Sequence, residues 1–406
     1  MLALIDVVYF LIFTVMIFSS VLWLIVYIIN RGKVHLDPDN GYRPDVTFII
    51  PAYNEEKYIG KTIESLLDQN YPEDKLRIIA VNDGSTDDTF EIMKQYEDRI
   101  DIIDKENSGK ASSMNTALKQ VKTEVVGCLD GDSFADPDML KSMVPYMRDE
   151  GVKGVTPAMK VKEPGSWVEK VIWAEYIYQV FLRKLFAIFD SQYVMPGPGS
   201  IYDTEMLREM GGWDEDTLTE DMEIAFRMHR KGVKIENSSN AYVETVSPES
   251  LKGLYRQRVR WYRGYIRNFF RYRDMVFNTR YGNLGLFLLP FNMVWNVIVV
   301  FILGHFLYNM ATGILQSYYT YQLVGFIPPS MSLSIQSLSM FHIFYTWFLL
   351  IGIANLLLSI KTAGEDVKLW KRKTHYVLFL WIYSFLYAGF WVAAALEEIR
   401  GGARRW

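Results

Sequence analysis

Residues 124–132, Glu124-Val125-Val126-Gly127-Cys128-Leu129-Asp130-Gly131-Asp132, join a short apolar run to a pair of carboxylates. Similar β-rich runs lie upstream, separated by amphipathic stretches typical of helices. The predicted strands are Val46–Tyr53, Leu76–Asp83, Ile100–Lys105 and Glu124–Asp130, and the predicted helices are Glu55–Gln69, Asp87–Glu97 and Lys110–Val121. Strands that alternate with helices indicate an α/β, Rossmann-like fold with a parallel sheet and helices on both faces.

Polar and small residues follow each predicted strand. They are Asn54-Glu55, Asn82-Asp83-Gly84-Ser85, Asn107-Ser108-Gly109-Lys110 and Asp130-Gly131-Asp132. In a parallel sheet, ligands bind beyond the carboxyl ends of the strands. The sequence therefore predicts a binding site at this edge of the sheet.

Asp130 and Asp132 are one residue apart, with Gly131 between them. Carboxylates so placed can hold a hard divalent cation, and the glycine allows a diphosphate to come close. A plain turn after a strand is the alternative reading of an isolated Asp-Gly-Asp. Because three other polar strand ends should line the same cleft, we favour the cation site.

Asp83 and Lys110 are further candidates at the strand ends. Asp83 can accept the imide hydrogen of a pyrimidine base; alternatively it caps a helix that starts near Thr86, although Ser85 could cap that helix instead. Lys110 follows Gly109 at a predicted helix N-terminus, where backbone amides and an ammonium group can meet phosphate. Taken alone, the Lys110 pattern is not specific.

Thr219-Glu220-Asp221 opens the predicted helix Glu220–Arg230, after a turn at Gly211-Gly212-Trp213. A capping box is the structural alternative, but Met222 does not fit its third position. The helix dipole lowers the pKa of a carboxylate at a helix start and keeps it ionised. We therefore expect Asp221 to act as a general base that takes a proton from an acceptor hydroxyl.

Gln257, Arg260 and Trp261 share one face of a helix predicted from Ser247 to about Arg273, because they are spaced i, i+3, i+4. The arginine can bind a diphosphate and the tryptophan can stack on a sugar ring. The alternative is a helix at the membrane surface whose arginines meet lipid headgroups. We prefer that alternative for Arg267, Arg271 and Arg273.

Several segments are predicted to contact lipid. Val7–Asn30 is uncharged, long enough to span about 30 Å of hydrocarbon, and followed by Arg31 and Lys33, which favours a retained anchor over a signal peptide. Trp167–Phe189 is aromatic-rich and should lie against the membrane surface.

Pro196–Ser200, with two prolines and two glycines, should be a loop.

No Asp, Glu, Lys or Arg occurs between Arg280 and Lys361. We expect spans near Leu284–Leu307 and Leu338–Ile360, split by a loop at Gln316–Ser330, and a third from about Tyr376 to Leu396. The basic link Lys361–Lys373 should be cytoplasmic with the catalytic segment. The basic tail Arg400, Arg404 and Arg405 would then lie on the opposite side, which this four-span arrangement does not explain.

The amino-acid composition argues against several classes of function. The net charge of −4 argues against nucleic-acid binding. One cysteine excludes an internal disulfide and a cysteine-built zinc cluster, and five scattered histidines argue against a histidine-built metal site.

Taken in order, the motifs resemble the processive branch of glycosyltransferase family 2, which includes poly-N-acetylglucosamine, chitin-oligosaccharide, hyaluronan and cellulose synthases. The resemblance covers most of the chain. It comprises Pro51-Ala52-Tyr53-Asn54-Glu55, Val81-Asn82-Asp83-Gly84-Ser85, Gly109-Lys110 with Asn115, Asp130-Gly131-Asp132, Gly212-Trp213, Thr219-Glu220-Asp221 and Gln257-Arg258-Val259-Arg260-Trp261.

The resemblance implies a GT-A fold and inverting transfer of a sugar, with N-acetylglucosamine favoured, from a UDP-sugar to a β-linked polysaccharide, coupled to export. Asp221 would be the base, with Glu220 beside the acceptor. Asp132 and Asp130 would hold Mg²⁺ or Mn²⁺ and the diphosphate. The donor would also meet Pro51, Tyr53, Glu55, Asp83, Lys110, Gln257, Arg260 and Trp261.

The expected layout is an N-terminal transmembrane helix (1–33), a cytoplasmic GT-A domain (34–246), an interfacial region (247–280) and transmembrane helices (281–406), in the plasma membrane. The small number of spans leaves room for an accessory membrane subunit. Two alternatives stay open: a non-processive enzyme that adds one sugar to a glycolipid acceptor, and a transporter. The transporter is disfavoured because the predicted spans contain no Asp, Glu, Lys or Arg.

Overall fold

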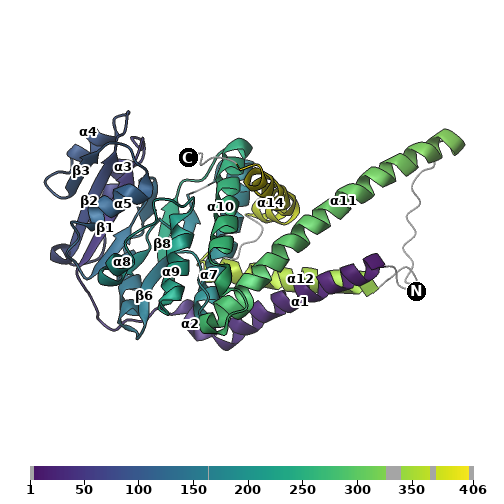
Figure 1. Cartoon of the computed structure of the whole chain (residues 1–406), viewed down its shortest axis with the longest axis horizontal. Coiled ribbons are helices and arrows are strands. Elements are labelled where there is room, and N and C mark those ends of the chain that lie inside the picture. Colours follow the sequence, from purple (N-terminus) through teal and green to yellow (C-terminus); the bar gives the residue numbers. More distant parts are fainter. Residues whose placement is uncertain (1–3, 163, 326–339, 366–371, 402–406) are drawn as a thin grey trace.

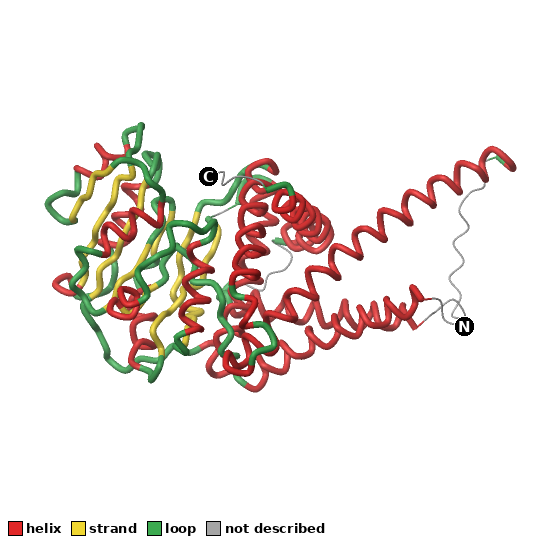
Figure 2. Tube along the Cα trace, in the orientation of Figure 1, coloured by secondary structure: helices red, strands yellow, loops and turns green. Residues whose placement is uncertain are grey.

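The computed structural model describes residues 4–162, 164–325, 340–365 and 372–401. A sheet covered by helices forms one end of the molecule, and long helices extend away from it at the other end (Figure 1). Figure 2 shows that the strands are confined to the first part. We call the sheet and the helices packed on it the catalytic unit.

One eight-stranded sheet forms the centre of this unit, in the order β3-β2-β1-β4-β7-β6-β8-β5. The strands are β1 (Val46–Ala52), β2 (Leu76–Asp83), β3 (Asp101–Lys105), β4 (Val125–Cys128), β5 (Ser133–Ala135), β6 (Val152–Val161), β7 (Ile201–Asp203) and β8 (Lys234–Thr245). Every residue of β1 is buried. Each fully buried aliphatic side chain there stabilises the fold by about 1.5–3 kcal/mol.

The sheet is mixed, so the prediction of a parallel sheet holds for β3-β2-β1-β4 and for the parallel pair of β6 and β8, but not for β7 and β5. β1 pairs in parallel with β2 and β4, and β2 with β3. β7 is antiparallel to both of its neighbours, β4 and β6, and β5 is antiparallel to β8. A buried strand is apolar whichever way it runs, so its composition does not encode its direction.

Helices cover both faces of the sheet, as predicted. They are α3 (Ile59–Leu67), α4 (Thr89–Lys94), α5 (Lys110–Leu118), α6 (Met139–Met143), α7 (Trp167–Ile188), α8 (Thr204–Glu209), α9 (Glu220–Arg230) and α10 (Leu251–Arg271), with α2 (Arg31–His35) after the first long helix. One apolar core includes residues of α3, α4 and α6, and a second includes residues of α5, α8 and α9. The sheet is therefore packed against helices on both faces.

Helix α7 does not lie on the membrane surface as predicted; it is buried. Val171, Ile172, Ala174 and Ile177 are all fully buried. The helix packs against β6 and β8 on one side and against the helices at residues 340–362 and 373–378 on the other. Because the helix has apolar neighbours on both sides, its aromatic-rich composition reflects protein contacts rather than lipid contacts.

The long helices are α1 (Leu4–Ile29), α11 (Leu289–Val324) and α12 (Met340–Thr362), and the shorter α13 (Lys373–Leu378) and α14 (Ser384–Ile399) follow them. Turns of π-helix, η5 (Leu284–Leu288) and η7 (Phe379–Tyr383), precede α11 and join α13 to α14. Among the described residues, three segments are long and apolar enough to cross a membrane: Leu4–Ile29, Leu284–Val324 and Lys373–Ile399. Leu349–Thr362 of α12 is a shorter apolar segment.

The loop predicted at Gln316–Ser330 is wrong in its first part, because α11 continues through Val324 and ends where Gly325 adopts φ +72°. Residues 326–330 lie outside the described residues, as do 338–339, 366–371 and the tail arginines Arg404 and Arg405. The described part of the basic link touches the sheet, since Lys160 of β6 pairs with Glu365 at 3.2 Å.

Candidate active site

The predicted site residues gather in two connected pockets at the carboxyl edge of the first strands. The smaller pocket, of about 210 Å³, is lined by Pro51, Tyr53, Glu55, Asp83, Lys110, Asp130 and Asp132. The larger cavity, of about 1260 Å³, is lined by Lys110, Asp130, Asp132, Glu220, Asp221, Gln257, Arg260 and Trp261. Lys110, Asp130 and Asp132 border both pockets. Asp132 and Asp221, far apart in the sequence, therefore open onto one cavity.

Asp83 ends strand β2 and is tied to the loop before α5. Its Oδ1 accepts hydrogen bonds from Lys105 Nζ at 2.5 Å and Ser108 N at 3.0 Å, and its Oδ2 accepts from Gly109 N at 2.8 Å. Burial would raise the pKa of Asp83, but these bonds outweigh it and lower the pKa. Asp83 is thus an ionised acceptor that fixes the position of the loop.

Asp83 caps no helix, and neither does Ser85, contrary to the alternative weighed from the sequence. Helix α4 begins at Thr89, and the Oδ1 of Asp87 accepts from the Thr89 N at 3.1 Å. The Ser85 hydroxyl accepts from the Asn54 N instead, at 3.0 Å, and so joins the ends of β1 and β2. Gly84, at φ +71°, allows this close turn.

The carboxyl groups of Glu55, Asp130 and Asp132 crowd together in the smaller pocket. Burial and the charge of Asp130 raise the pKa of Asp132 to about 6. Burial, with Asp132 and Asp130 nearby, raises the pKa of Glu55 to about 8. Gly131 packs against Glu55, because a Cβ at position 131 would lie 3.1 Å from the Glu55 Cγ. Crowded carboxylates of this kind attract a cation.

Lys110, the first residue of α5, joins the two halves of the site. Its Nζ lies 2.6 Å from Asp130 Oδ1 and 3.0 Å from Glu220 Oε1. Burial would lower the pKa of Lys110, but the two carboxylates raise it well above its usual value. The Pro196–Ser200 loop, predicted correctly, packs on this pair: a Cβ on Gly197 would lie 2.9 Å from Asp130 Oδ1.

Glu220 and Asp221 start helix α9 and differ in their pKa. Despite its burial, the charges of Lys110 and Arg260 lower the pKa of Glu220. Burial and the neighbouring charge of Glu220 raise the pKa of Asp221 to about 6, so the lowered pKa predicted from the helix dipole is wrong. A base with a pKa near 6 is ionised at neutral pH and can still accept a proton.

Thr219 precedes these carboxylates without capping the helix through its side chain. Its hydroxyl instead accepts from Asn268 Nδ2 at 3.1 Å, and Gly264 leaves the space that its side chain occupies. The start of α9 is therefore packed directly against α10.

Helix α10 presents Gln257, Arg260 and Trp261 to the larger cavity. Within the described part of the chain, Gln257 Oε1 is buried without a hydrogen-bond partner. The buried guanidinium of Arg258 lies over the Trp261 ring at 4.1 Å and pairs with Glu175 at 2.6 Å. Gln257 is thus ready to accept from a ligand, and Arg258 fixes the tryptophan.

Two arginines that we assigned to lipid headgroups bind protein carboxylates instead. Arg267 pairs with Glu398 at 2.9 Å, and Arg271 pairs with Asp214. Because these partners lie far away in the sequence, the α10 sequence could not reveal them. For Arg273 the headgroup contact stays a prediction.

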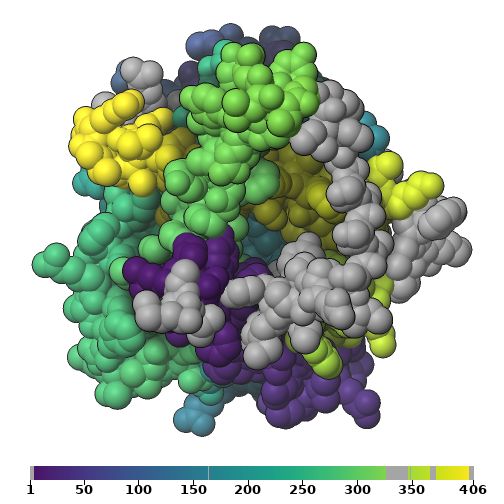
Figure 3. Space-filling model, turned by 90° about the vertical axis from the view of Figure 1, so that its right-hand side faces the viewer, coloured from purple at the N-terminus to yellow at the C-terminus, as the bar shows by residue number. Residues whose placement is uncertain are grey.

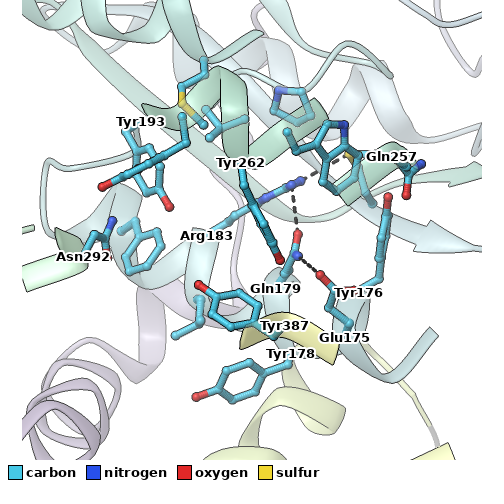
Figure 4. A pocket seen from close by; sticks show the side chains of 18 of the residues that line it. Glu175, Tyr176, Tyr178, Gln179, Arg183, Tyr193, Gln257, Tyr262, Asn292 and Tyr387 are labelled. Carbon is cyan, nitrogen blue, oxygen red and sulfur yellow. Dashed lines mark hydrogen bonds between the residues drawn. The ribbon is translucent and has the colours of Figure 1, made fainter. Parts of the chain in front are cut away.

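A row of polar residues on α7 borders the site and was not predicted from the sequence. Gln179 Nε2 donates to Glu175 Oε1 at 2.8 Å, and Arg183 Nη2 donates to Gln179 Oε1 at 3.1 Å, all in the wall of the larger cavity (Figure 4). Tyr262 and Tyr387 lie beside this row. The i, i+4 spacing of polar residues within an apolar helix was the available signal.

A comparison of sequences identifies the family. The family described as Glycosyltransferase like family 2 matches residues 44–264, which include every predicted site residue. The chain belongs to this glycosyltransferase family. It is therefore an enzyme that transfers a sugar.

Relatives in this glycosyltransferase family include polysaccharide synthases. The poly-beta-1,6-N-acetyl-D-glucosamine synthase of Staphylococcus aureus (strain COL) is 27% identical over 301 residues, covering 70% of this chain and 72% of the relative. The synthase of the same name from Staphylococcus epidermidis is 29% identical over 262 residues, 63% of each chain.

A solved glycosyltransferase supports the GT-A fold. The mannosyltransferase PcManGT from Pyrobaculum calidifontis, in complex with GDP-Man and Mn²⁺, superposes with a TM-score of 0.61. Its sequence is 19% identical, and the match covers 96% of this chain and 98% of that one. At this identity the likeness concerns the fold alone.

A divalent cation fits the glycosyltransferase site only together with a substrate. Among the described residues, no group of three or more His, Cys, Asp or Glu side chains could hold a metal by itself. Mg²⁺, however, is commonly bound by one or two carboxylates and completed by substrate phosphates and water. The Asp130 and Asp132 pair meets that requirement.

Proposed function

We propose that this glycosyltransferase transfers N-acetylglucosamine from UDP-N-acetylglucosamine to the end of a growing β-linked polysaccharide, with inversion at the anomeric carbon. The observation that carries the proposal is the continuity of the larger cavity. Its lining runs from Asp132 and Asp221 past Trp261 to Trp295 of α11 and Ile353 of α12. Such a cavity suits a product that leaves the catalytic unit along the apolar helices.

The acceptor end would be activated by Asp221. Its carboxylate takes the proton of an acceptor hydroxyl as that oxygen attacks the anomeric carbon. The bond between that carbon and the diphosphate oxygen breaks in the same step, and UDP leaves. One base suffices for this single displacement, and no covalent enzyme intermediate is needed.

Charge that develops on the departing diphosphate would be stabilised by Lys110 and Arg260, which both border the cavity. A Mg²⁺ or Mn²⁺ ion held by Asp130 and Asp132 would neutralise the phosphate oxygens when bound. Asp83, at the end of β2, would accept the imide hydrogen of the uracil ring. Gln257 Oε1 and Trp261 would bind the sugar by a hydrogen bond and by stacking.

The names of the relatives support the choice of donor and product. The three helices that are long enough to cross a membrane support a membrane location. We place the catalytic unit in the cytoplasm, where nucleotide sugars are made. Arg31 and Lys33 lie at the end of α1 that faces the catalytic unit, and basic residues that flank a membrane span favour the cytoplasmic side.

The test is to incubate the purified protein with radiolabelled nucleotide sugars, one at a time, and to size the products. The proposal predicts a polymer from UDP-N-acetylglucosamine and none from the Asp221→Asn variant run in parallel. A product that carries one sugar on a lipid would replace processive synthesis by the single-addition alternative. Turnover of another donor only would overturn the assigned sugar.

A further inference from the structure

The apolar segment Lys373–Ile399, which comprises α13, η7 and α14, has both of its ends on the catalytic unit. At its start, the Arg372 guanidinium lies 4.4 Å over the ring of Trp173, a buried residue of α7. At its end, Glu398 accepts from Arg263 Nε at 2.6 Å and from Arg267 Nε at 2.9 Å. Both arginines belong to α10.

Between its ends the segment stays in contact with the same two helices. Phe379 meets Tyr178 of α7 with ring centroids 6.3 Å apart. Further along, Trp391 stacks on Tyr262 of α10 at 4.7 Å, with the ring planes 9° apart. A helix that crossed a bilayer would leave the catalytic unit at one end.

Helix α10 is held in place by contacts with the loop before α9 and with the start of α9. The contacts of α14 with α10 therefore keep α14 beside the catalytic unit. Arg271 pairs with Asp214, and Asn268 bonds Thr219 beside the catalytic carboxylates. The sheet strand β6, α7, α10 and the segment also share one apolar cluster, which includes Met159, Trp173, Leu254, Tyr376 and Phe390.

The direction of the segment agrees with these contacts. In Figure 1, α1, α11 and α12 extend away from the sheet, whereas α14 lies beside α10 and is viewed nearly along its axis. In Figure 3, turned by 90°, the yellow-green to yellow segment crosses the molecule from one side to the other. The segment therefore runs across the base of the long helices.

Its outer side is apolar and exposed. Trp381 is 72% exposed and Ile399 is 82% exposed, and Val392 and Leu396 continue the same stripe at helical spacing. Phe385, on the same side, is partly exposed and also contacts Phe306 of α11. The buried Phe390, Trp391 and Ala394 form the opposite side, toward α10. Basic residues stand at both ends, Lys373 and Arg400. An exposed apolar stripe with flanking cations fits the boundary between headgroups and acyl chains.

We propose that residues 373–399 do not cross the membrane but lie in the lipid leaflet that faces the catalytic unit, with this apolar stripe in the acyl boundary. The basic residues of the link and of the tail then stand on one side of the membrane, as the distribution of basic charge favours. This removes the conflict that the tail created for a four-span arrangement. The proposal does not depend on which sugar is transferred.

Single cysteines test the sidedness. Cys128, the chain's one cysteine, is 1% exposed, so the unmodified chain serves as the unlabelled control. Thr374→Cys and Arg400→Cys probe the two ends, Gln95→Cys marks the catalytic unit, and Thr320→Cys marks the far end of α11; all four positions are exposed. Intact membrane vesicles of both orientations are treated with a membrane-impermeant maleimide.

We expect positions 374, 400 and 95 to be labelled in one vesicle orientation, and position 320 in the other. Labelling of positions 374 and 400 from opposite sides would overturn the proposal. Labelling of both ends on the side of position 320 would overturn it as well, because the segment would then lie away from the catalytic unit.

Depth gives a second test that does not rely on vesicle orientation. An environment-sensitive fluorophore is attached to Trp381→Cys or to Leu396→Cys. Its quenching is then compared between lipids that carry a quencher at different depths in the bilayer. The two sites are about 22 Å apart along a helix, so a spanning helix would place them at clearly different depths. We expect the same shallow depth for both. Unequal depths, or quenching by aqueous iodide alone, would contradict the proposal.

Discussion

Lys110 Nζ lies 2.6 Å from Asp130 Oδ1, and the same ammonium is 3.0 Å from Glu220 Oε1. One side chain thus joins the carboxylates at the end of β4 to those at the start of α9. Without a cation in this position, Asp130 and Glu220 would face each other as like charges.

Replacing this lysine by a neutral side chain should impair donor use. Charge-assisted hydrogen bonds contribute about 1.5–3 kcal/mol, so Lys110→Met should lower kcat/KM for the nucleotide sugar by about 10- to 100-fold. Lys94→Met is the matched control, because Lys94 is exposed and contacts Glu91 and the Phe90 ring, both on its own helix. Equal kcat/KM values for the two variants would refute this role of Lys110.

Asp221→Asn should abolish transfer, because the amide cannot take the acceptor proton. Loss of a general base costs about 10²- to 10⁴-fold in kcat. UDP affinity, measured by calorimetry, should stay close to that of the parent protein. The exposed Asp216→Asn in the preceding loop is the control. If Asp221→Asn kept its turnover, another group would have to be the base.

The pH profile should report the same carboxylate. The pKa of Asp221 is raised to about 6, and the base is active when ionised, so kcat/KM should fall below pH 6 and level off above it. The positive charge of Lys110 lowers this pKa. The midpoint should therefore move to higher pH in Lys110→Met. A midpoint that stays in place or moves down would separate the profile from Asp221.

Chelation should stop the reaction, and Mg²⁺ or Mn²⁺ should restore it. Asp132→Asn removes one of two carboxylates, so the cation concentration for half-maximal activity should rise by about tenfold or more. Asp98→Asn, at an exposed site away from the pockets, should not change it. Full activity of the parent protein in excess chelator would argue against the metal role of Asp132.

The buried ion pair of Arg258 and Glu175 predicts a large effect on stability. Arg258→Ala leaves a buried carboxylate without its partner, which costs about 3–5 kcal/mol of unfolding free energy. Thermal unfolding should show a smaller loss for the double variant Arg258→Met with Glu175→Gln. Lys94→Ala, in an exposed pair, should cost less than about 1 kcal/mol. A single variant as stable as the double one would contradict this account.

Much of the fold could be predicted from the sequence, because the residue patterns that indicate strands and helices are local. Strand β2 and helix α9 have the bounds predicted, Leu76–Asp83 and Glu220–Arg230. The site residues at the strand ends were predicted because polar residues at the ends of parallel strands must meet at one edge. Their chemical roles are still predictions, which the variants above address.

What the sequence did not reveal depends on partners that are distant in the chain. Helix α7 looked like a surface helix, since its residues do not say whether protein or lipid covers them. Arg267 found Glu398, and Arg271 found Asp214. The pKa of Asp221 was predicted from the helix dipole, but its value depends on burial and on Glu220.

The length of α11 bears on how a product would leave the enzyme. A 36-residue helix is about 54 Å long, well beyond the roughly 30 Å of the hydrocarbon layer. If it crosses near the membrane normal, its last turns, with Tyr318, Tyr319 and Tyr321, stand above the outer surface. If the enzyme exports the polysaccharide proposed above, the sugar rings of the product could stack on these tyrosines on the far side of the membrane.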